Sequence, residues 1–340
     1  MRKLDRLLWI APLLTAIVAH AQPIRTPVEA PGPGGPLKGE MLSPGPLIGQ
    51  PVGPPAGTPI GPVALIIPGS GPTDRDGNNP LGIRASTYRL LAQDLAGRGI
   101  TTVRIDKRGM FASAAATPDA NAVTIADYAS DTGAWIAALR QRTGAACVWL
   151  IGHSEGGLVA MAAAKSQAGV CGLVLVSAAG RPLGEVLREQ LKANPANAPL
   201  LAQAMPAIDA LEQGRNVETA ALHPALLNLF GPQIQGFLIS AFSYDPRRLL
   251  AGYRQPVLVV QGTRDIQVGE ADARLLKQAS PHAELVLLPD VNHVLKRVAS
   301  EDLRANHAAY ADPDLPLAPG VGSAVAGFIE RHAAAAEPSR

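Results

Sequence analysis

The fold of this chain is decided by residues 148–165, which read VWLIGHSEGGLVAMAAAK. The apolar residues 148–151 predict a buried strand, and residues 157–165 predict a helix. Between them lies the pattern G-x-S-x-G, with Ser154 at its centre. Glycines on either side give room for a sharp strand-to-helix turn, which exposes the serine and points helix N–H groups towards it. This context makes the pattern specific, and the alternative is a glycine-rich turn with an idle serine.

A nucleophilic serine needs an acid and a base, which this pattern predicts in the chain order Ser, Asp or Glu, His. Asp265 follows the strand-like stretch 256–262, and His293 follows the strand-like stretch 283–289. Active sites of open α/β sheets lie at the carboxyl ends of the strands, where Ser154, Asp265 and His293 should therefore meet. His293 would take the Ser154 proton and pass it to the leaving group, while Asp265 would hold the imidazole tautomer.

Aspartate is common in turns, so the sequence offers a second candidate for the acid. Asp290 is the alternative acid. Another usual position for the acid follows residues 173–176, but that segment continues as Ser-Ala-Ala and offers no carboxylate. A surface turn is the alternative explanation for His293. The competing histidines either lie near a terminus, do not directly follow a strand, or, as with His153, are expected to point away from the serine; they are His20, His153, His223, His282, His307 and His332.

Acyl transfer also needs hydrogen-bond donors for the developing oxyanion. One donor should be the backbone N–H of Glu155, the residue after the serine. The other should come from the loop 68–72, which follows the strand-like stretch 63–67. We assign it to the Ser70 N–H, because Gly69 and Gly71 let the backbone approach closely. A plain Gly/Pro turn is the alternative.

Together these motifs resemble the serine-hydrolase type of α/β-hydrolase, near the bacterial esterase, lysophospholipase-like and serine-aminopeptidase-like branches. The resemblance implies the α/β-hydrolase fold, a Ser-His-Asp triad and hydrolysis of an acyl bond, but no particular substrate. Two departures are Pro68, where many relatives carry histidine, and residues 110–113, where relatives commonly have a glycine-containing turn. The matching stretches are residues 65–78, 106–109, 152–157, 262–265 and 292–296.

From Val63 onward, strand-like and helix-like stretches alternate, which predicts a mostly parallel sheet with helices on both faces. The alternation stops at residues 181–254, where helical segments resemble the family's cap. We therefore expect a core of residues 63–180 and 255–336, with the cap between them and residues 299–320 at the rim of the cleft. Parallel strands should begin near Val63, Thr101, Val148, Leu173, Val257 and Ala283. Cap residues that could line an acyl pocket, although packing explains them better, are Leu226, Leu229, Phe230, Phe237 and Phe242.

Residues 1–21 predict a secretory signal peptide, with a basic start, an apolar run over residues 7–19 and an A-x-A cleavage site ending at Ala21. The run is short for a membrane span and contains Pro12. We therefore expect a periplasmic or secreted protein without a stable membrane span after cleavage; an uncleaved anchor is the alternative. Residues 22–62 hold 12 Pro and 9 Gly and predict a linker or a loosely docked segment. Residues 38–42 are the one candidate remnant of a first hairpin.

Cys147 and Cys171 are the only cysteines. Each lies at the start of a predicted strand, and in the fold that the chain resembles these two strands are neighbours. Adjacent strands lie about 4.8 Å apart, within the range that a disulfide spans. Export would place the pair in an oxidising compartment, so we expect a disulfide. The alternative is two buried free thiols.

The net charge of +2 gives no support for nucleic-acid binding. The expected function is hydrolysis of a small-molecule carboxylic (acyl) ester through the Ser-His-Asp triad and an acyl-enzyme intermediate, with neither a metal nor a cofactor. One alternative is an aminopeptidase-like serine hydrolase, in which the Glu155 side chain could bind a substrate α-amine. The other is a catalytically idle scaffold used for binding.

Overall fold

The computed structural model describes residues 22–45, 61–300 and 302–336. The predicted signal peptide, residues 1–21, lies outside the described residues. Within them, eight strands form one sheet in the order β1-β2-β4-β3-β5-β6-β7-β8. The strands β3 to β8 pair in parallel, which confirms the predicted fold class. They are β3 Val63–Ile67, β4 Thr101–Ile105, β5 Val148–His153, β6 Val170–Val176, β7 Val257–Gly262 and β8 Glu284–Leu288.

The N-terminal segment differs from the expectation of a linker. Strands β1 (Ile24–Ala30) and β2 (Leu37–Ser43) form an antiparallel hairpin, and β2 pairs antiparallel with β4. Side chains on one face of the hairpin, such as Val28 in β1 and Leu37 in β2, are buried in the core. The stabilisation from this burial outweighs the unfavourable effect of the many Pro and Gly residues on strand formation. Pro27 is tolerated because β1 is an edge strand. The prediction of a linker or loosely docked segment is therefore wrong for residues 24–43. Residues 38–42, the candidate remnant of a first hairpin, do lie in a hairpin strand, β2. Residues 46–60 lie outside the described residues.

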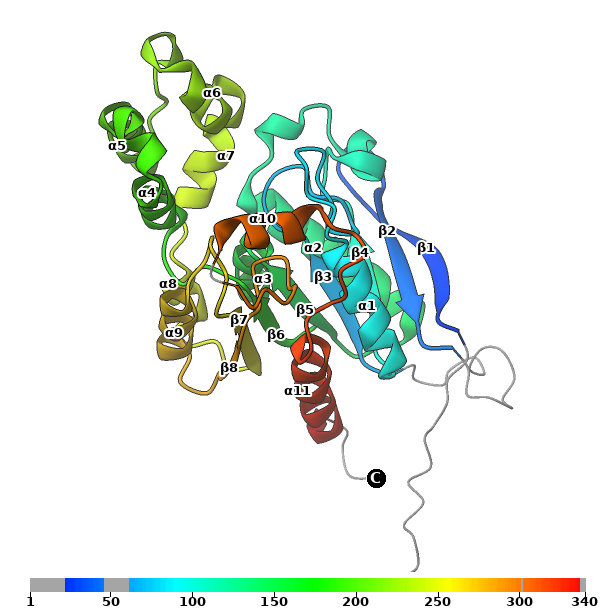
Figure 1. The fold of residues 1–340 in the computed structure, drawn as a ribbon. Coiled ribbons are helices and arrows are strands. Elements are labelled where there is room, and N and C mark those ends of the chain that lie inside the picture. Colours follow the sequence, from blue (N-terminus) through cyan, green and yellow to red (C-terminus); the bar gives the residue numbers. More distant parts are fainter. Residues whose placement is uncertain (1–21, 46–60, 301, 337–340) are drawn as a thin grey trace, which may run out of the picture.

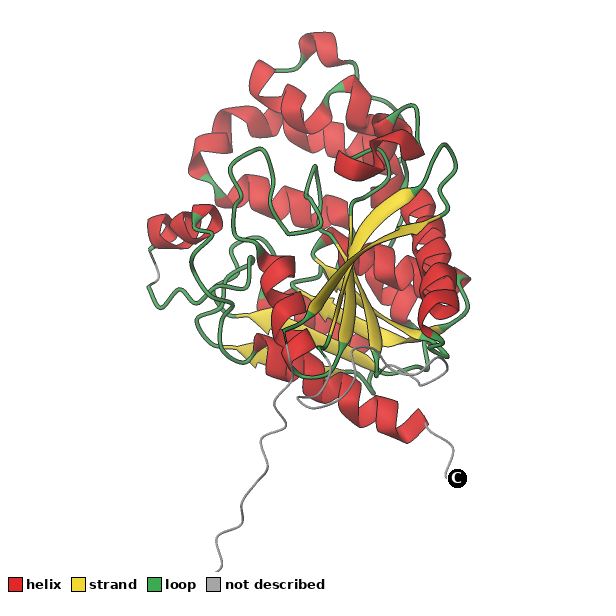
Figure 2. Cartoon of the chain, turned by 90° about the vertical axis from the view of Figure 1, so that its right-hand side faces the viewer, coloured by secondary structure: helices red, strands yellow, loops and turns green. Residues whose placement is uncertain are grey.

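Helices cover both faces of the sheet, as predicted (Figure 2). Helices α1 (Thr87–Gly97) and α11 (Val321–Ala336) share a hydrophobic cluster with one face. Helices α2 (Ile125–Thr143), α3 (Glu155–Ser166) and α9 (Glu270–Ala279) pack on the other. The two clusters exclude water from the sheet, so the polar groups that gather at its carboxyl edge are held by a rigid support.

The cap is a helical layer with its own hydrophobic core, above the sheet in Figure 2. Leu226, Phe230 and Phe242 are buried in that core and therefore pack within the cap. The last helix of the predicted cap range, α8 (Pro246–Leu250), instead packs on the main core, where Leu250 is buried. The cap helices are α4 Leu183–Ala193, α5 Leu201–Glu212, α6 Pro224–Phe230 and α7 Pro232–Phe242.

Within the described ranges, no single helix is long and apolar enough to cross a membrane. Helices α6 and α7 would reach that length and composition only as a pair, and they are bent by 52° relative to each other.

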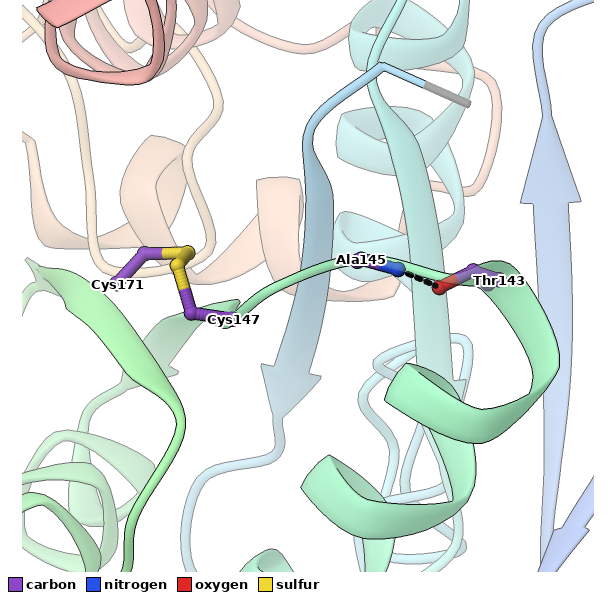
Figure 3. Close-up of a disulfide and its surroundings, with 4 residues drawn as sticks. All are labelled: Thr143, Ala145, Cys147 and Cys171. Atoms are coloured by element: carbon purple, nitrogen blue, oxygen red, sulfur yellow. Dashed lines mark hydrogen bonds between the residues drawn. A yellow bond between two sulfur atoms is a disulfide. The ribbon is translucent and has the colours of Figure 1, made fainter. Parts of the chain in front are cut away.

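Cys147 and Cys171 form a disulfide, with their Cα atoms 5.1 Å apart (Figure 3). Cys147 directly precedes β5, and Cys171 is the second residue of β6. The two strands are parallel neighbours, so the bond joins them near their amino ends. Ser154 follows the carboxyl end of β5, at the opposite edge of the sheet.

Removing this disulfide should lower stability and spare catalysis. The closed loop has a sequence separation of 24 residues, and in the chain-entropy model a loop of that length stabilises by about 3 kcal/mol. We expect the Cys147→Ala/Cys171→Ala variant to lose about that much free energy of unfolding in urea denaturation. Its kcat/KM should match that of the wild type. An unchanged urea midpoint, or a folded variant without activity, would contradict the prediction.

Candidate active site

Ser154 lies in the turn between β5 and α3 with φ 54° and ψ −121°. A positive φ is unfavourable for a residue with a side chain, so the surrounding backbone must impose it. The flanking glycines allow the turn to pack. A Cβ on Gly152 would lie 2.3 Å from the Gly156 carbonyl oxygen, and a Cβ on Gly156 would lie 2.2 Å from that of Ile67. The G-x-S-x-G spacing is thus a steric requirement of this turn.

Asp265 and His293 meet at the carboxyl edge of the sheet, three and five residues after the ends of β7 and β8. The Nδ1 atom of His293 lies 2.8 Å from Oδ2 of Asp265. The Asp265 side chain is fully buried, and the His293 side chain is 6% exposed. Ser154 and His293 line the same cavity. The structure therefore brings the three predicted residues to one place.

The Asp265 carboxylate is held by four hydrogen bonds. Oδ1 accepts from the backbone N–H groups of Gln267 and Val268 at 2.8 and 2.9 Å. Oδ2 accepts from His293 and, at 3.2 Å, from the side-chain amide of Gln261. Burial alone would raise the pKa of Asp265, but the charge and hydrogen bond of His293 and the two N–H groups hold that pKa below its usual value. Asp265 is therefore an anion that can orient an imidazole.

Gln261 was missed by the sequence analysis. It is the one polar side chain in the otherwise apolar strand β7, and it is 1% exposed. Its amide also donates to the Val268 carbonyl at 2.8 Å, which braces the turn that carries Asp265. The sequence did contain a sign of this role, namely a polar residue inside an otherwise apolar strand, because a buried polar side chain needs hydrogen-bond partners.

The alternative acid, Asp290, has other partners. Its carboxylate lies 3.7 Å from the side-chain nitrogens of Arg264 and Arg297. Its side chain is also 31% exposed, whereas that of Asp265 is fully buried. The geometry therefore favours Asp265 as the partner of His293.

His153 takes part in a buried hydrogen-bond chain that the sequence analysis did not anticipate. Its Nε2 lies 2.8 Å from the backbone carbonyl of His293, and its Nδ1 lies 2.9 Å from the Tyr88 hydroxyl. A carbonyl only accepts, so Nε2 carries the proton and Nδ1 accepts from Tyr88. Burial lowers the pKa of His153 to about 3, so the ring is neutral at physiological pH. The Tyr88 oxygen in turn accepts from the Gly69 N–H at 2.9 Å, which joins the loop after β3 to the turns that carry Ser154 and His293.

The two predicted oxyanion donors have no competing acceptor in the part of the chain that the structure describes. The Gly69 N–H donates to Tyr88, whereas the next amide, that of Ser70, has no acceptor among the described residues. Glu155 is the first residue of α3, where an N–H has no acceptor within the helix. The loop passes close to the nucleophile, because a Cβ on Gly69 would lie 3.3 Å from the Ser154 Cβ. Both N–H groups are therefore suitable donors beside Ser154.

The Glu155 side chain is not open to a substrate amine. Its carboxylate oxygen Oε1 lies 3.3 Å from Nζ of Lys107, and the two side chains are only 5% and 4% exposed. This ion pair lies outside the set of residues that line the cavity.

The cavity at Ser154 is small, about 60 Å³. No cap residue lines it, which agrees with the expectation that packing explains the cap phenylalanines and leucines better than an acyl pocket does. Leu226, Leu229, Phe230 and Phe242 pack in the core of the cap, and Phe237 also contacts the ring of Tyr128 in α2. Among the described residues, no group of three or more His, Cys, Asp or Glu is arranged to hold a metal ion. The lining residues are Gly69, Ser70, Thr73, Gly77, Ile83, Thr87, Tyr88, His153, Ser154, Gln267, His293 and Val294.

Helix α10 (Leu303–Ala311), in the insertion expected at the rim of the cleft, contacts the cavity-lining residue Gln267. The Tyr310 hydroxyl accepts from the Gln267 side chain at 3.1 Å, and the Tyr310 carbonyl accepts from the Arg84 N–H at 2.7 Å. The Asn306 amide donates to the Arg264 carbonyl at 2.7 Å. These bonds fix α10 to the loops after β3 and β7, next to the lining residues Ile83 and Gln267.

Known proteins share this fold and part of this sequence. The chain is 25% identical over 245 residues to the esterase EstD of Thermotoga maritima, a match that covers 69% of this chain and 54% of EstD. The chain thus spans about half the length of that relative. Two solved structures share the fold: the α/β-hydrolase GrgF from Penicillium sp. sh18 has a TM-score of 0.56 at 18% identity, and Est1E from Butyrivibrio proteoclasticus has 0.52 at 16%. The match to GrgF covers 92% of this chain and the match to Est1E covers 91%, and each match covers 99% of the neighbour's chain.

The family model described as "Serine aminopeptidase, S33" matches residues 81–297, a range that includes Ser154, Asp265 and His293. More than half of the sequence lies in this range, so the match shows the family of the chain. The chain therefore belongs to the S33 serine aminopeptidase family of α/β-hydrolases.

Proposed function

We propose that this protein is a carboxylic-ester hydrolase that works through Ser154, His293 and Asp265. One observation carries the proposal. Ser154, held at a positive φ, shares a cavity with His293, whose Nδ1 donates to the buried Asp265 carboxylate. This arrangement combines a nucleophile, a base and an orienting acid.

The hydrogen bond to Asp265 places the imidazole proton on Nδ1 and leaves Nε2 of His293 free to accept the Ser154 proton. The serine oxygen then attacks the ester carbonyl, and the N–H groups of Ser70 and Glu155 stabilise the oxyanion. His293 returns the proton to the leaving alkoxide, and an acyl-serine forms. Water, deprotonated by His293, then attacks the acyl carbonyl, and the same N–H groups stabilise the oxyanion. The bond between the acyl carbon and the Ser154 oxygen breaks, His293 returns the proton to that oxygen, and the acid leaves.

Two features favour an ester over an aminoacyl substrate. The Glu155 carboxylate is occupied by Lys107, and the residues that line the cavity include no acidic side chain that could bind an α-ammonium group. The relative EstD bears the name of an esterase. A cavity of about 60 Å³ suits a short acyl group, so we propose a small acyl ester as the substrate class.

Parallel turnover assays test this choice against the aminopeptidase activity that the family's description suggests. The substrates are p-nitrophenyl acetate and butyrate, and alanyl and prolyl p-nitroanilides. Burying the substrate's α-ammonium group without a partner is unfavourable by several kcal/mol. We therefore expect kcat/KM for the anilides to be at least about 100-fold lower than kcat/KM for the esters. Anilide turnover that matches ester turnover and needs the free α-amine would make the protein an aminopeptidase. A folded protein that turns over neither class would be an idle scaffold.

We further propose that the protein acts in the periplasm or outside the cell. The signal-like residues 1–21 and the Cys147–Cys171 disulfide support this location. Mass spectrometry of protein from the periplasm or medium should give a chain that begins at Gln22 and has no free thiol. A full-length chain with two free thiols in the cytosol would contradict the proposal.

A further inference from the structure

We propose that Lys107 is a positioning residue that ties the two oxyanion donors, Ser70 and Glu155, into one unit. This inference rests on the proposed function, because it assigns a role in the same acyl-transfer site. It concerns a buried lysine that the mechanism above leaves unused, and that does not line the cavity at Ser154.

Lys107 lies where the loops of three neighbouring strands converge. It is the second residue after β4, Gly69 is the second residue after β3, and Glu155 opens the helix that follows β5. The sheet order places β4, β3 and β5 side by side. The Lys107 ammonium donates to the Gly69 carbonyl at 2.7 Å and lies 3.3 Å from the Glu155 carboxylate. It thus bridges the two loops that supply the oxyanion donors.

The bond to Gly69 fixes the direction of the Ser70 N–H. In a trans peptide the C=O of one residue and the N–H of the next point in opposite directions, and no described peptide bond is cis. Since Lys107 holds the Gly69 carbonyl on one side of the loop, the Ser70 N–H must point to the other side. A cation on the carbonyl also polarises that peptide, which makes its N–H a stronger donor.

The same loop is held at a second point. The peptide that precedes Gly69 donates its N–H to Tyr88, so successive peptides are fixed by two different partners. The Lys107 ammonium also lies 5.3 Å from the centre of the Tyr128 ring, which adds a cation–π contact. The ammonium is therefore surrounded by groups that stabilise a positive charge at one position.

The simplest competing explanation is that Lys107 only neutralises the buried Glu155. A comparison of three variants separates the two roles: Lys107→Met, Glu155→Gln and the double variant. The single Lys107→Met change leaves a buried carboxylate without its partner and is expected to destabilise the fold. The double variant buries no charge at this place, so it should fold, but it still lacks the bond to the Gly69 carbonyl.

We expect kcat of the double variant on p-nitrophenyl acetate to be about 10–100-fold below that of Glu155→Gln, with KM within about twofold. A loss confined to kcat is the mark of an interaction made in the transition state. Lys165→Met is the matched control, because Lys165 also donates to a backbone carbonyl, that of Ala251, but from the far end of α3. Its kcat should equal that of the wild type.

A double variant with the kcat of Glu155→Gln would overturn the positioning role, and so would a double variant that fails to fold. Ser154→Ala, measured alongside, separates this test from the proposed function. If wild type and Ser154→Ala are equally inactive, the function is wrong. If wild type is active and Ser154→Ala is not, the comparison of the Lys107 variants decides the inference.

Discussion

Replacing Ser154 with alanine should lower kcat for ester hydrolysis by about 10⁴–10⁶-fold, because the acyl-enzyme route is lost with the nucleophile. The fold should survive. Alanine keeps a Cβ at the positive φ of this turn, so the backbone cost is close to that of serine. The measurements are kcat on p-nitrophenyl acetate, the thermal unfolding midpoint, and covalent labelling by a fluorophosphonate.

Wild type should take up one fluorophosphonate per chain and Ser154→Ala none. A control is Ser177→Ala, because Ser177 also follows a strand end with a positive φ but does not line the cavity. That variant should still be labelled. Near wild-type turnover by Ser154→Ala, or a wild type that resists the label, would remove Ser154 from the mechanism.

Replacing Asp265 with asparagine should lower kcat by about 10³–10⁴-fold. Two backbone N–H groups, from Gln267 and Val268, point at Oδ1 and would select the amide oxygen of asparagine for that position. The amide NH₂ would then face Nδ1 of His293 and donate to it. The imidazole would carry its proton on Nε2 and could not accept one from Ser154.

Asp290→Asn is the matched control for this prediction. Asp290 lies 3.7 Å from each of two arginines at a partly exposed site, where ion pairs contribute little, so kcat should change by less than about twofold. Steady-state kinetics on both folded variants decide between the two acids. If Asp290→Asn is the more damaged variant, the acid has been assigned to the wrong residue.

The parallel sheet and the place of the site could be predicted from the sequence because both depend on local patterns. An apolar stretch of five to seven residues forms a buried strand, and the turn after it lies at the carboxyl edge whatever the rest of the chain does. This is why Asp265 and His293 could be placed from the strands that precede them. The turn at Ser154 is partly local: Gly152 is needed by a steric contact within the strand–turn–helix unit, whereas Gly156 is needed by a contact with the adjacent strand β3.

The N-terminal hairpin shows where composition misleads. Prolines and glycines in residues 22–62 predicted a linker, yet β1 and β2 join the sheet. The stabilisation comes from burial of residues such as Val28 and Leu37 against α2 and the sheet, a contact that a local reading of the segment does not contain. The cap shows the reverse case. Its phenylalanines were candidates for a substrate pocket, but Phe230 and Phe242 are buried among the cap helices, and Phe237 packs against Tyr128 of α2.

The sequence by itself determined the fold class, through the alternation of strand-like and helix-like stretches after Val63, and it named the candidate residues Ser154, Asp265 and His293 from the turns in which they lie. Only the tertiary structure decided what holds the site in place. Lys107 contacts residues 38 and 48 positions away, and Tyr88 contacts a histidine 65 positions away. A hydrogen bond between buried polar groups depends on which loops the sheet order brings side by side, and on the direction in which each side chain then points. Neither is encoded in the few residues around Lys107 or Tyr88, so their roles emerge only when the strands are assembled.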